Sequence, residues 1–140
     1  MVAGPIERAR DLIPQLLKPR VWSLDRTSWG IFLILIGLFK KVAIADGLAG
    51  AVNSVYDASG AVSTMDVYLA TLFFAVQIYC DFSGYSDIAI GVSALLGIDL
   101  MMNFNVPYSS CNPSEFWRRW HISLSSWLRD YLYIPPGRES

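Results

Sequence analysis

The chain has 140 residues, of which 54% are hydrophobic, 14% aromatic and only 16% charged. This composition is too apolar for an ordinary soluble domain of that size, so we expect the chain to lie in a lipid bilayer. Its 11 basic and 12 acidic residues are segregated, with no Lys or Arg between Lys41 and Arg118, and it has no basic cluster of the kind that binds nucleic acid.

Residues 1–27 are polar, mixed in charge and interrupted by prolines, so we expect a loop at the membrane surface with a short amphipathic turn over 11–17. The apolar stretch 28–52 is long enough to cross a hydrocarbon core of about 30 Å at about 1.5 Å per residue. Lys40 and Lys41 interrupt this stretch. They could extend to the headgroups, face a polar neighbour, or mark a break between two half-helices.

A second apolar stretch occupies residues 66–98, after an expected loop over 53–65 and with Asp66 as the expected N-cap. If this stretch is helical throughout, the helix is longer than the thickness of one bilayer core. Because polar residues interrupt it, we expect a kink near Gly84 or a span followed by a half-helix. If the basic N-terminal segment is cytoplasmic, the first loop lies outside and the chain returns inward.

Residues 99–111 predict a loop, and Asn112, Pro113 and Glu115 form a helix-start pattern of N-cap, first-turn proline and capping acid. We expect one helix over 113–134. Its apolar residues then share an arc of about 140°. These residues are Trp117, Trp120, His121, Leu124, Trp127, Leu128, Tyr131 and Leu132. The pattern predicts an amphipathic helix at the membrane interface, and an anchoring helix without chemistry fits it equally well.

His121 is the single histidine of the chain. An imidazole titrates near neutral pH and could take a proton from a hydroxyl as general base. Asp130 falls on the opposite face of the expected helix, so it cannot complete a triad, and no metal-ligand spacing is present. From the residues alone, a hydrogen-bonded packing role is therefore favoured. Cys80 and Cys111 have no metal spacing either, and we expect Cys80 to be a buried, inert thiol.

The polar cluster of the second apolar stretch is where function is to be sought first, because ionisable groups persist in hydrocarbon mainly where they have a role. On a helix, Gln77, Asp81 and Gly84 share one stripe, whereas Ser83 and Asp87 lie about 120° away. The two aspartates are thus poorly placed as a paired acid and base. Glycine on the stripe suggests close approach of another helix. A polar lock between helices and a substrate channel remain equal alternatives.

Five segments in colinear order together resemble the membrane-bound O-acyltransferase family. They are VAGPIERA at 2–9, GLFKKVAIAD at 37–46, QIYCDFSGYSDIAIG at 77–91, NFNVPY at 103–108 and EFWRRWHISLSSWLRDYLYIP at 115–135. The likeness is strongest to the bacterial branch that O-acetylates alginate. It implies that residues 1–140 are part of an all-α domain of polytopic transmembrane helices, with a re-entrant or kinked segment and an amphipathic interfacial helix, in the bacterial inner membrane.

The resemblance also implies a function. An acyl group would pass from a cytoplasmic donor, expected to be acetyl-CoA, to an exported polysaccharide such as alginate or to an extracytoplasmic acetyltransferase partner. His121 occupies the family's first signature position and is the expected catalytic residue, assisting by orienting or donating a hydrogen bond. No bound cofactor and no metal are expected. A second family histidine, assigned as the base, would follow beyond residue 140.

Further site residues are expected from the same resemblance. The tunnel-lining or structural polar residues would be Gln77, Asp81, Ser83, Tyr85, Asp87, Asn103, Trp117, Trp120 and Ser125. Arg118, Arg119 and Arg129 would bind the anionic donor or hold the helix at anionic headgroups.

Two other classes of function remain open: a transporter segment in which Asp81 and Asp87 relay ions or protons, and a non-catalytic scaffold that recruits a partner. The chain departs from the family pattern after residue 135. We expect it to be an internal part of a longer protein and to be inactive by itself.

Overall fold

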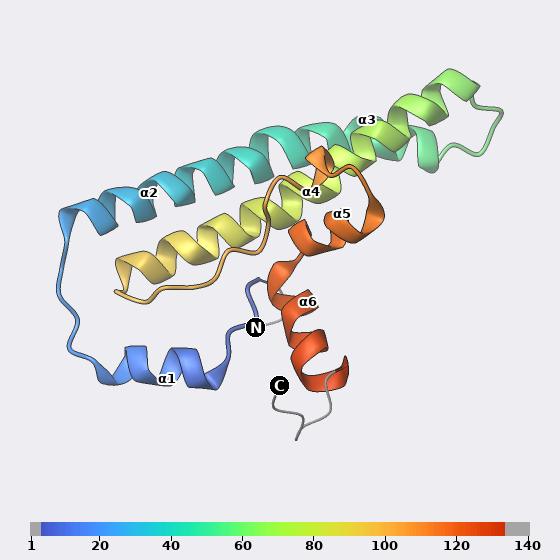
Figure 1. Cartoon of the computed structure of the whole chain (residues 1–140). Helices are drawn as coiled ribbons and strands as arrows, with labels where there is room; N and C mark the ends of the chain where they lie inside the picture. The colour runs from blue at the N-terminus through green and yellow to red at the C-terminus, as the bar shows by residue number, and fades with distance from the viewer. Residues whose placement is uncertain (1–3, 134–140) are drawn as a thin grey trace.

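The computed structural model describes residues 4–133 and is helical over that range, without a strand (Figure 1). Two long helical runs lie side by side and antiparallel, and the loop after the second run turns back along it and leads to the short C-terminal helices (Figure 1). The predicted all-α class is therefore confirmed for these residues. The number of membrane crossings stays a prediction.

The first long run comprises α2 (Leu24–Leu38), the π-helix η1 (Phe39–Ala45) and α3 (Asp46–Tyr56), which follow one another without a break. It is preceded by α1 (Ala9–Leu17), none of whose residues is buried. The short amphipathic turn predicted over 11–17 is observed as α1, whereas the predicted loop is wrong at residues 24–27, which form the first turn of α2. The helical run that contains the predicted apolar span 28–52 extends beyond it at both ends.

The π-helix η1 begins directly before the two lysines, and its wide turn is of the kind often found at functional or strained places. Lys40 Nζ lies 2.6 Å from Asp87 Oδ2, and Lys41 Nζ lies 2.7 Å from Asp81 Oδ1 and 3.0 Å from Asp46 Oδ1. Of the three alternatives for the lysines, a polar neighbour is therefore the one observed.

The second run is α4 (Thr64–Leu95), one continuous helix. Within residues 4–133 it is the one helix long and apolar enough to cross a membrane, judged by length and composition. Ser63 is its N-cap and accepts a hydrogen bond from the backbone N–H of Met65 at 3.2 Å, so the prediction of Asp66 was wrong. The preceding loop shortens to residues 57–63 because α3 extends to Tyr56.

The predicted alternative of a span followed by a half-helix is wrong, because α4 passes through Gly84 unbroken, and the predicted kink there stays a prediction. The carboxylates of Asp81 and Asp87, on either side of Gly84, pair with the two lysines of η1. The helix therefore need not open to expose these carboxylates to water. Gly84 instead serves close packing. A Cβ at Gly84 would lie 2.7 Å from the carbonyl oxygen of Gly37, and one at Gly91 would lie 2.5 Å from that of Gly30. The predicted close approach of a neighbouring helix is confirmed.

After α4, Gly97 adopts φ +75° and lets the Ile98 N–H bond to the Ser93 carbonyl at 2.9 Å, which closes the helix end. A loop with one 3₁₀ turn, η2 (Pro107–Ser109), follows as predicted. Its next elements are α5 (Pro113–Arg119), α6 (Ile122–Leu128) and the π-helical turn η3 (Arg129–Tyr133).

The predicted start of the C-terminal helical segment is confirmed. The Asn112 side chain accepts the Glu115 backbone N–H at 2.8 Å, and Pro113 is the first helical residue. The predicted single helix over 113–134 is wrong, however, because the backbone is extended at Trp120 and left-handed at His121. The apolar arc calculated for a continuous helix therefore does not exist as one face. Residue 134 lies outside the described residues.

Candidate functional site

The break between α5 and α6 is built by the loop that follows α4. The backbone N–H of Asn105 donates to the Arg119 carbonyl at 3.0 Å, and the backbone N–H of Ile122 donates to the Asn103 carbonyl at 2.9 Å. Between these two bonds, His121 takes φ 46° and ψ 54°. A left-handed backbone costs a non-glycine residue on the order of 1–3 kcal/mol and persists only where the surroundings enforce it. The loop therefore fixes where the imidazole lies.

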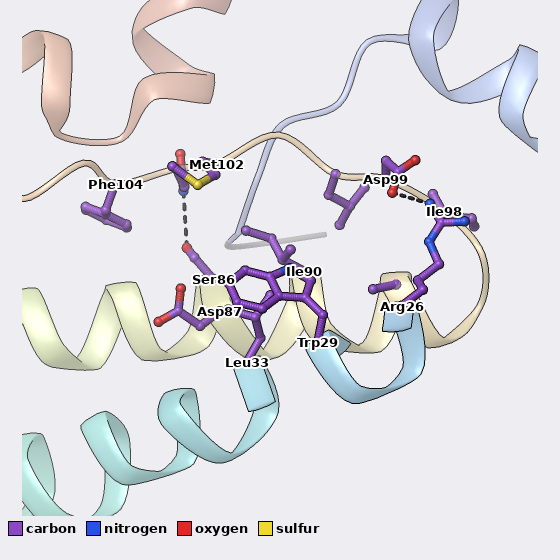
Figure 2. A pocket seen from close by; sticks show the side chains of 13 residues that line it. Arg26, Trp29, Leu33, Ser86, Asp87, Ile90, Ile98, Asp99, Met102 and Phe104 are labelled. Atoms are coloured by element: carbon purple, nitrogen blue, oxygen red, sulfur yellow. Dashed lines mark hydrogen bonds and ion pairs between the residues drawn. The ribbon is translucent and has the colours of Figure 1, made fainter. Parts of the chain in front are cut away.

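Asn103 is the centre of the site and is only 1% exposed. Its Oδ1 lies 3.1 Å from His121 Nδ1, accepts the Ser123 hydroxyl at 2.8 Å and accepts the Ser123 backbone N–H at 3.2 Å. Its Nδ2 donates to Ser86 Oγ on α4 at 3.3 Å, the bond drawn from Ser86 in Figure 2. One buried amide thus joins the loop, α4 and the start of α6 beside the histidine.

Aromatic rings cover the α4 side of the imidazole. Phe82 meets the His121 ring edge to face with centroids 4.7 Å apart, and Phe104 packs edge to face on both Phe82 and Trp120 at 5.0 Å. Phe116 stacks on Trp120 at 5.5 Å. Burial in this cluster lowers the pKa of His121 below its ordinary value of 6.5. The imidazole is therefore predominantly neutral at pH 7.

A cavity of about 210 Å³ lies next to this cluster, between α2, the C-terminal half of α4 and the loop after it (Figure 2). Its polar wall includes Ser86, Asp87 and Asn103, and the ion pair between Arg26 and Asp99 lies at another side. The rest of its wall is mostly apolar. The Asn103 amide therefore contacts the cavity and His121 at once.

The predicted polar residues of α4 lie on different sides of that helix. Asp81 and Asp87 bind lysines of η1, as expected for a polar lock between helices, and Asp87 also borders the cavity. Gln77 Oε1 and Ser83 Oγ are buried and have no hydrogen-bond partner within residues 4–133. Tyr85 is exposed. The structure thus does not gather these five side chains around His121.

The predicted residues of the C-terminal helices separate as well. Trp120 belongs to the aromatic cluster, whereas Trp117 is 60% exposed. The Ser125 hydroxyl approaches the carbonyls of Trp117 and Trp120, at 3.3 and 3.5 Å. It therefore satisfies the end of α5 and makes no hydrogen bond to His121 among the described residues.

The three arginines do not form one anion-binding group. Arg119 pairs with Glu115 at 2.5 Å, Arg129 pairs with Asp130 at 3.1 Å, and Arg118 is exposed. A donor-binding role for them stays a prediction. Over the described part of the chain, no group of three His, Cys, Asp or Glu side chains could hold a metal ion.

Sequence reasoning placed Ser86 in the polar cluster of the second apolar stretch but missed Ser123, Phe82 and Phe104 as parts of the site. A continuous helix would place Ser123 away from His121, and only the break turns both toward Asn103. The contacts of Asn103 with Ser86 and Ser123 join residues 17 and 20 positions apart, beyond the reach of any helical period. The available signal was the loop segment NFNVPY itself, whose asparagines and proline favour a fixed turn.

Comparison with known proteins decides the family. The model of MBOAT, the membrane-bound O-acyltransferase family, matches residues 1–140. The chain belongs to the membrane-bound O-acyltransferase family. The resemblance inferred from the five sequence segments is thereby confirmed.

Individual relatives of this family are also similar. The chain is 48% identical over 137 residues to the probable alginate O-acetylase AlgI of Azotobacter vinelandii and 42% identical over 139 residues to the peptidoglycan O-acetyltransferase of Helicobacter pylori. It is 34% identical over 140 residues to the teichoic acid D-alanyltransferase of Bacillus subtilis. These alignments cover 98%, 98% and 94% of the chain but only 27%, 26% and 34% of the relatives. The chain thus spans about a quarter to a third of their length.

The sequence segments that resemble the family have distinct structural roles in this chain. The glycines and lysines of the first long run bind it to α4, and the NFNVPY loop holds the turn at His121. The predicted signature position, His121, therefore lies where three separate segments meet.

Proposed function

We propose that the chain is part of a membrane O-acyltransferase of the bacterial inner membrane. It would transfer an acyl group, expected to be acetyl from acetyl-CoA, to a hydroxyl of an exported polysaccharide such as alginate. Family membership supports the transfer, and the names of the relatives refer to alginate, peptidoglycan and teichoic acid. An extracytoplasmic acetyltransferase that receives the acyl group first is an alternative acceptor.

The observation that supports this proposal most directly is the backbone conformation and environment of His121. The single histidine of the chain is held in a strained backbone conformation, bonded through one nitrogen to a buried amide and partly covered by aromatic rings. The hydrogen bond and the aromatic contacts would also suit a packing histidine, but a packing role does not require the left-handed backbone. Strained residues with prearranged partners occur preferentially at functional sites.

The reaction transfers an acyl group from the sulfur of a thioester to the oxygen of a hydroxyl. A base removes the proton of the acceptor hydroxyl while its oxygen attacks the carbonyl carbon of the acyl thioester. The tetrahedral intermediate collapses, the carbon–sulfur bond breaks, and the thiolate leaves and takes up a proton. Hydrogen-bond donors near the carbonyl oxygen would stabilise the negative charge that develops there. His121 could take the hydroxyl proton or supply a hydrogen bond.

The long helices suit a membrane setting. We place α4 across the bilayer, since it is long and apolar enough to cross it, and with it the antiparallel run of α2, η1 and α3, which packs along α4. Their charged groups face one another, with Lys40 bound to Asp87 and Lys41 bound to Asp81. Pairing of this kind is how ionisable groups are tolerated in hydrocarbon.

The test uses the full-length protein in membranes that contain its polysaccharide acceptor. We expect His121→Gln to lower polymer acetylation by about 10²-fold or more at unchanged protein level, the usual contribution of an acid–base group. Ser114→Ala, an exposed position on α5, is the matched control and should acetylate normally. Normal acetylation by His121→Gln would refute the catalytic role.

A transporter segment is the second candidate, favoured by the intramembrane ion pairs. In that case Asp81→Asn would abolish uptake of an ion or solute and His121→Gln would not. The geometry favours the acyltransferase, because both aspartates are neutralised by lysines of η1. A non-catalytic scaffold would tolerate both changes as long as partner recruitment remained intact.

A further inference from the structure

The hydrogen bonds at Asn103 fix which way its amide points. The backbone N–H of Ser123, 3.2 Å away, can only donate, so the amide atom that faces it must be the oxygen. The Ser123 hydroxyl donates to the same oxygen at 2.8 Å. On the other side, the amide nitrogen donates to Ser86 Oγ. The opposite orientation would set an N–H against an N–H in a buried place.

This orientation decides the protonation of the imidazole. The Ser123 hydroxyl lies 3.4 Å from His121 Nδ1, but its single hydrogen goes to Asn103 Oδ1 at the shorter distance of 2.8 Å. Asn103 Oδ1 has no hydrogen, so the contact with His121 Nδ1 at 3.1 Å requires Nδ1 to donate. In a neutral imidazole the other nitrogen, Nε2, then carries a lone pair and no hydrogen. Among the described residues Nε2 makes no hydrogen bond. It is therefore free to accept one from another molecule.

We propose that Asn103 is a positioning residue that holds His121 in the Nδ1–H form, so that Nε2 accepts the proton of the acyl-acceptor hydroxyl. This differs from the expectation that His121 donates a hydrogen bond while a later histidine is the base, because a neutral imidazole protonated on Nδ1 cannot donate from Nε2. The inference rests on the proposed function of His121 for its catalytic consequence. The tautomer itself does not depend on that function.

The loop that carries Asn103 is braced against rotation. The Glu7 carboxylate accepts the backbone N–H of Met101 at 2.6 Å. Gln15 exchanges two hydrogen bonds with the backbone of Asp99, at 2.7 and 3.1 Å. Val106 is held at φ 42°, which is rare for a β-branched residue. Anchored on both sides, the loop keeps the Asn103 amide at one distance from the imidazole.

The direct test is ¹⁵N NMR of the full-length protein labelled at histidine, in lipid and at a pH where His121 is neutral. The His121 signals are those missing from His121→Gln. We expect one nitrogen of His121 in the protonated range and the other in the range of an unprotonated ring nitrogen, with a coupling pattern that assigns the proton to Nδ1. A wild-type spectrum with the proton on Nε2 overturns the proposal.

Variants connect the tautomer to turnover. Asn103→Ala removes the acceptor, and we expect loss of the single Nδ1–H form and a kcat about 10- to 100-fold lower, the range found when the orienting partners of metal-bound histidines are removed. Asn103→Asp keeps an acceptor oxygen and should retain the Nδ1–H form and more of the activity than Asn103→Ala. Asn105→Ala is the matched control, since that side chain is exposed and makes no hydrogen bond among the described residues.

The outcomes separate the two claims. A folded Asn103→Ala protein that keeps Nδ1–H and wild-type kcat overturns the positioning role. If His121→Gln is fully active and the wild-type protein shows the Nδ1–H form, the catalytic proposal is overturned and the tautomer assignment stands. If Asn103→Ala does not fold, the wild-type spectrum and Asn103→Asp still decide, because loss of Nδ1–H in Asn103→Asp contradicts the role of the acceptor oxygen.

Discussion

The glycine contacts between α2 and α4 allow a quantitative prediction for Gly37→Ala. A Cβ at Gly37 would lie 2.5 Å from the Gly84 carbonyl oxygen and 2.7 Å from Ile88 Cγ1, whereas real Cβ contacts are essentially never below 3.0 Å. The helices would have to separate by at least about 0.5 Å, the difference between 3.0 and 2.5 Å. That movement would also stretch the ion pair between Lys40 and Asp87, now at 2.6 Å.

Overpacking of this kind costs about 1–3 kcal/mol, and the clash with backbone places Gly37→Ala toward the upper end. The gain in helix propensity from glycine to alanine, about 1 kcal/mol, offsets part of it. Gly50→Ala on α3 is the matched control, because a Cβ at Gly50 would have no atom of the described residues within 4 Å. It should receive the propensity gain without the clash. The two variants should therefore differ by roughly 2–3 kcal/mol.

The assay follows labelling of Cys80 by a maleimide reagent as the full-length protein is heated in detergent, with labelled peptides quantified by mass spectrometry. Cys80 is 6% exposed and should react only on unfolding, whereas exposed Cys111 reacts at once and calibrates the reagent. The relatives are about four times as long as this chain, and for a protein of that length 1 kcal/mol shifts the midpoint by roughly 1 °C, so Gly37→Ala should unfold about 2–3 °C below Gly50→Ala. Equal labelling temperatures for the two variants would show that α2 and α4 are not in close contact at Gly37.

Three further predictions follow from charged groups. The first is a double-mutant cycle of Lys40→Met and Asp87→Leu, measured by the same assay. Each single variant should be less stable than the double variant, with a coupling free energy of about 1–3 kcal/mol. Additive effects of the two substitutions would exclude the ion pair. The backbone N–H of Cys111 and an arginine one turn later lower the pKa of Glu115 below its ordinary value of 4.5. This stabilisation is present above pH 4.5 and is lost as the pH falls through the lower native pKa, so hydrogen exchange in α5 should rise there in wild type and not in Glu115→Gln. Because burial lowers the pKa of His121, its neutral form persists below pH 6.5, and the acid limb of kcat/KM for acetylation should lie below that pH; a limb above it would contradict the buried, neutral imidazole.

Several features of this protein followed from the sequence because they depend on neighbours along the chain. The cap at Asn112 and Glu115 was predictable, since an N-cap side chain bonds to a backbone N–H three residues on. The close approach at Gly84 was predictable in kind, because glycine in an apolar helix leaves room for a second backbone. The all-α class followed from long apolar stretches with helix-compatible residues.

Only the tertiary structure decided which lysine meets which aspartate, that α4 runs unbroken through its polar segment, and that the C-terminal helix breaks at His121. Each depends on groups far apart in sequence: η1 pairs the carboxylates of α4, and the loop at Asn103 and Asn105 takes over hydrogen bonds that a continuous helix would have made. A helical period assumes that every backbone group bonds within its own helix. Where a loop competes for those groups, the period fails, and in this protein that place is the site of the single histidine.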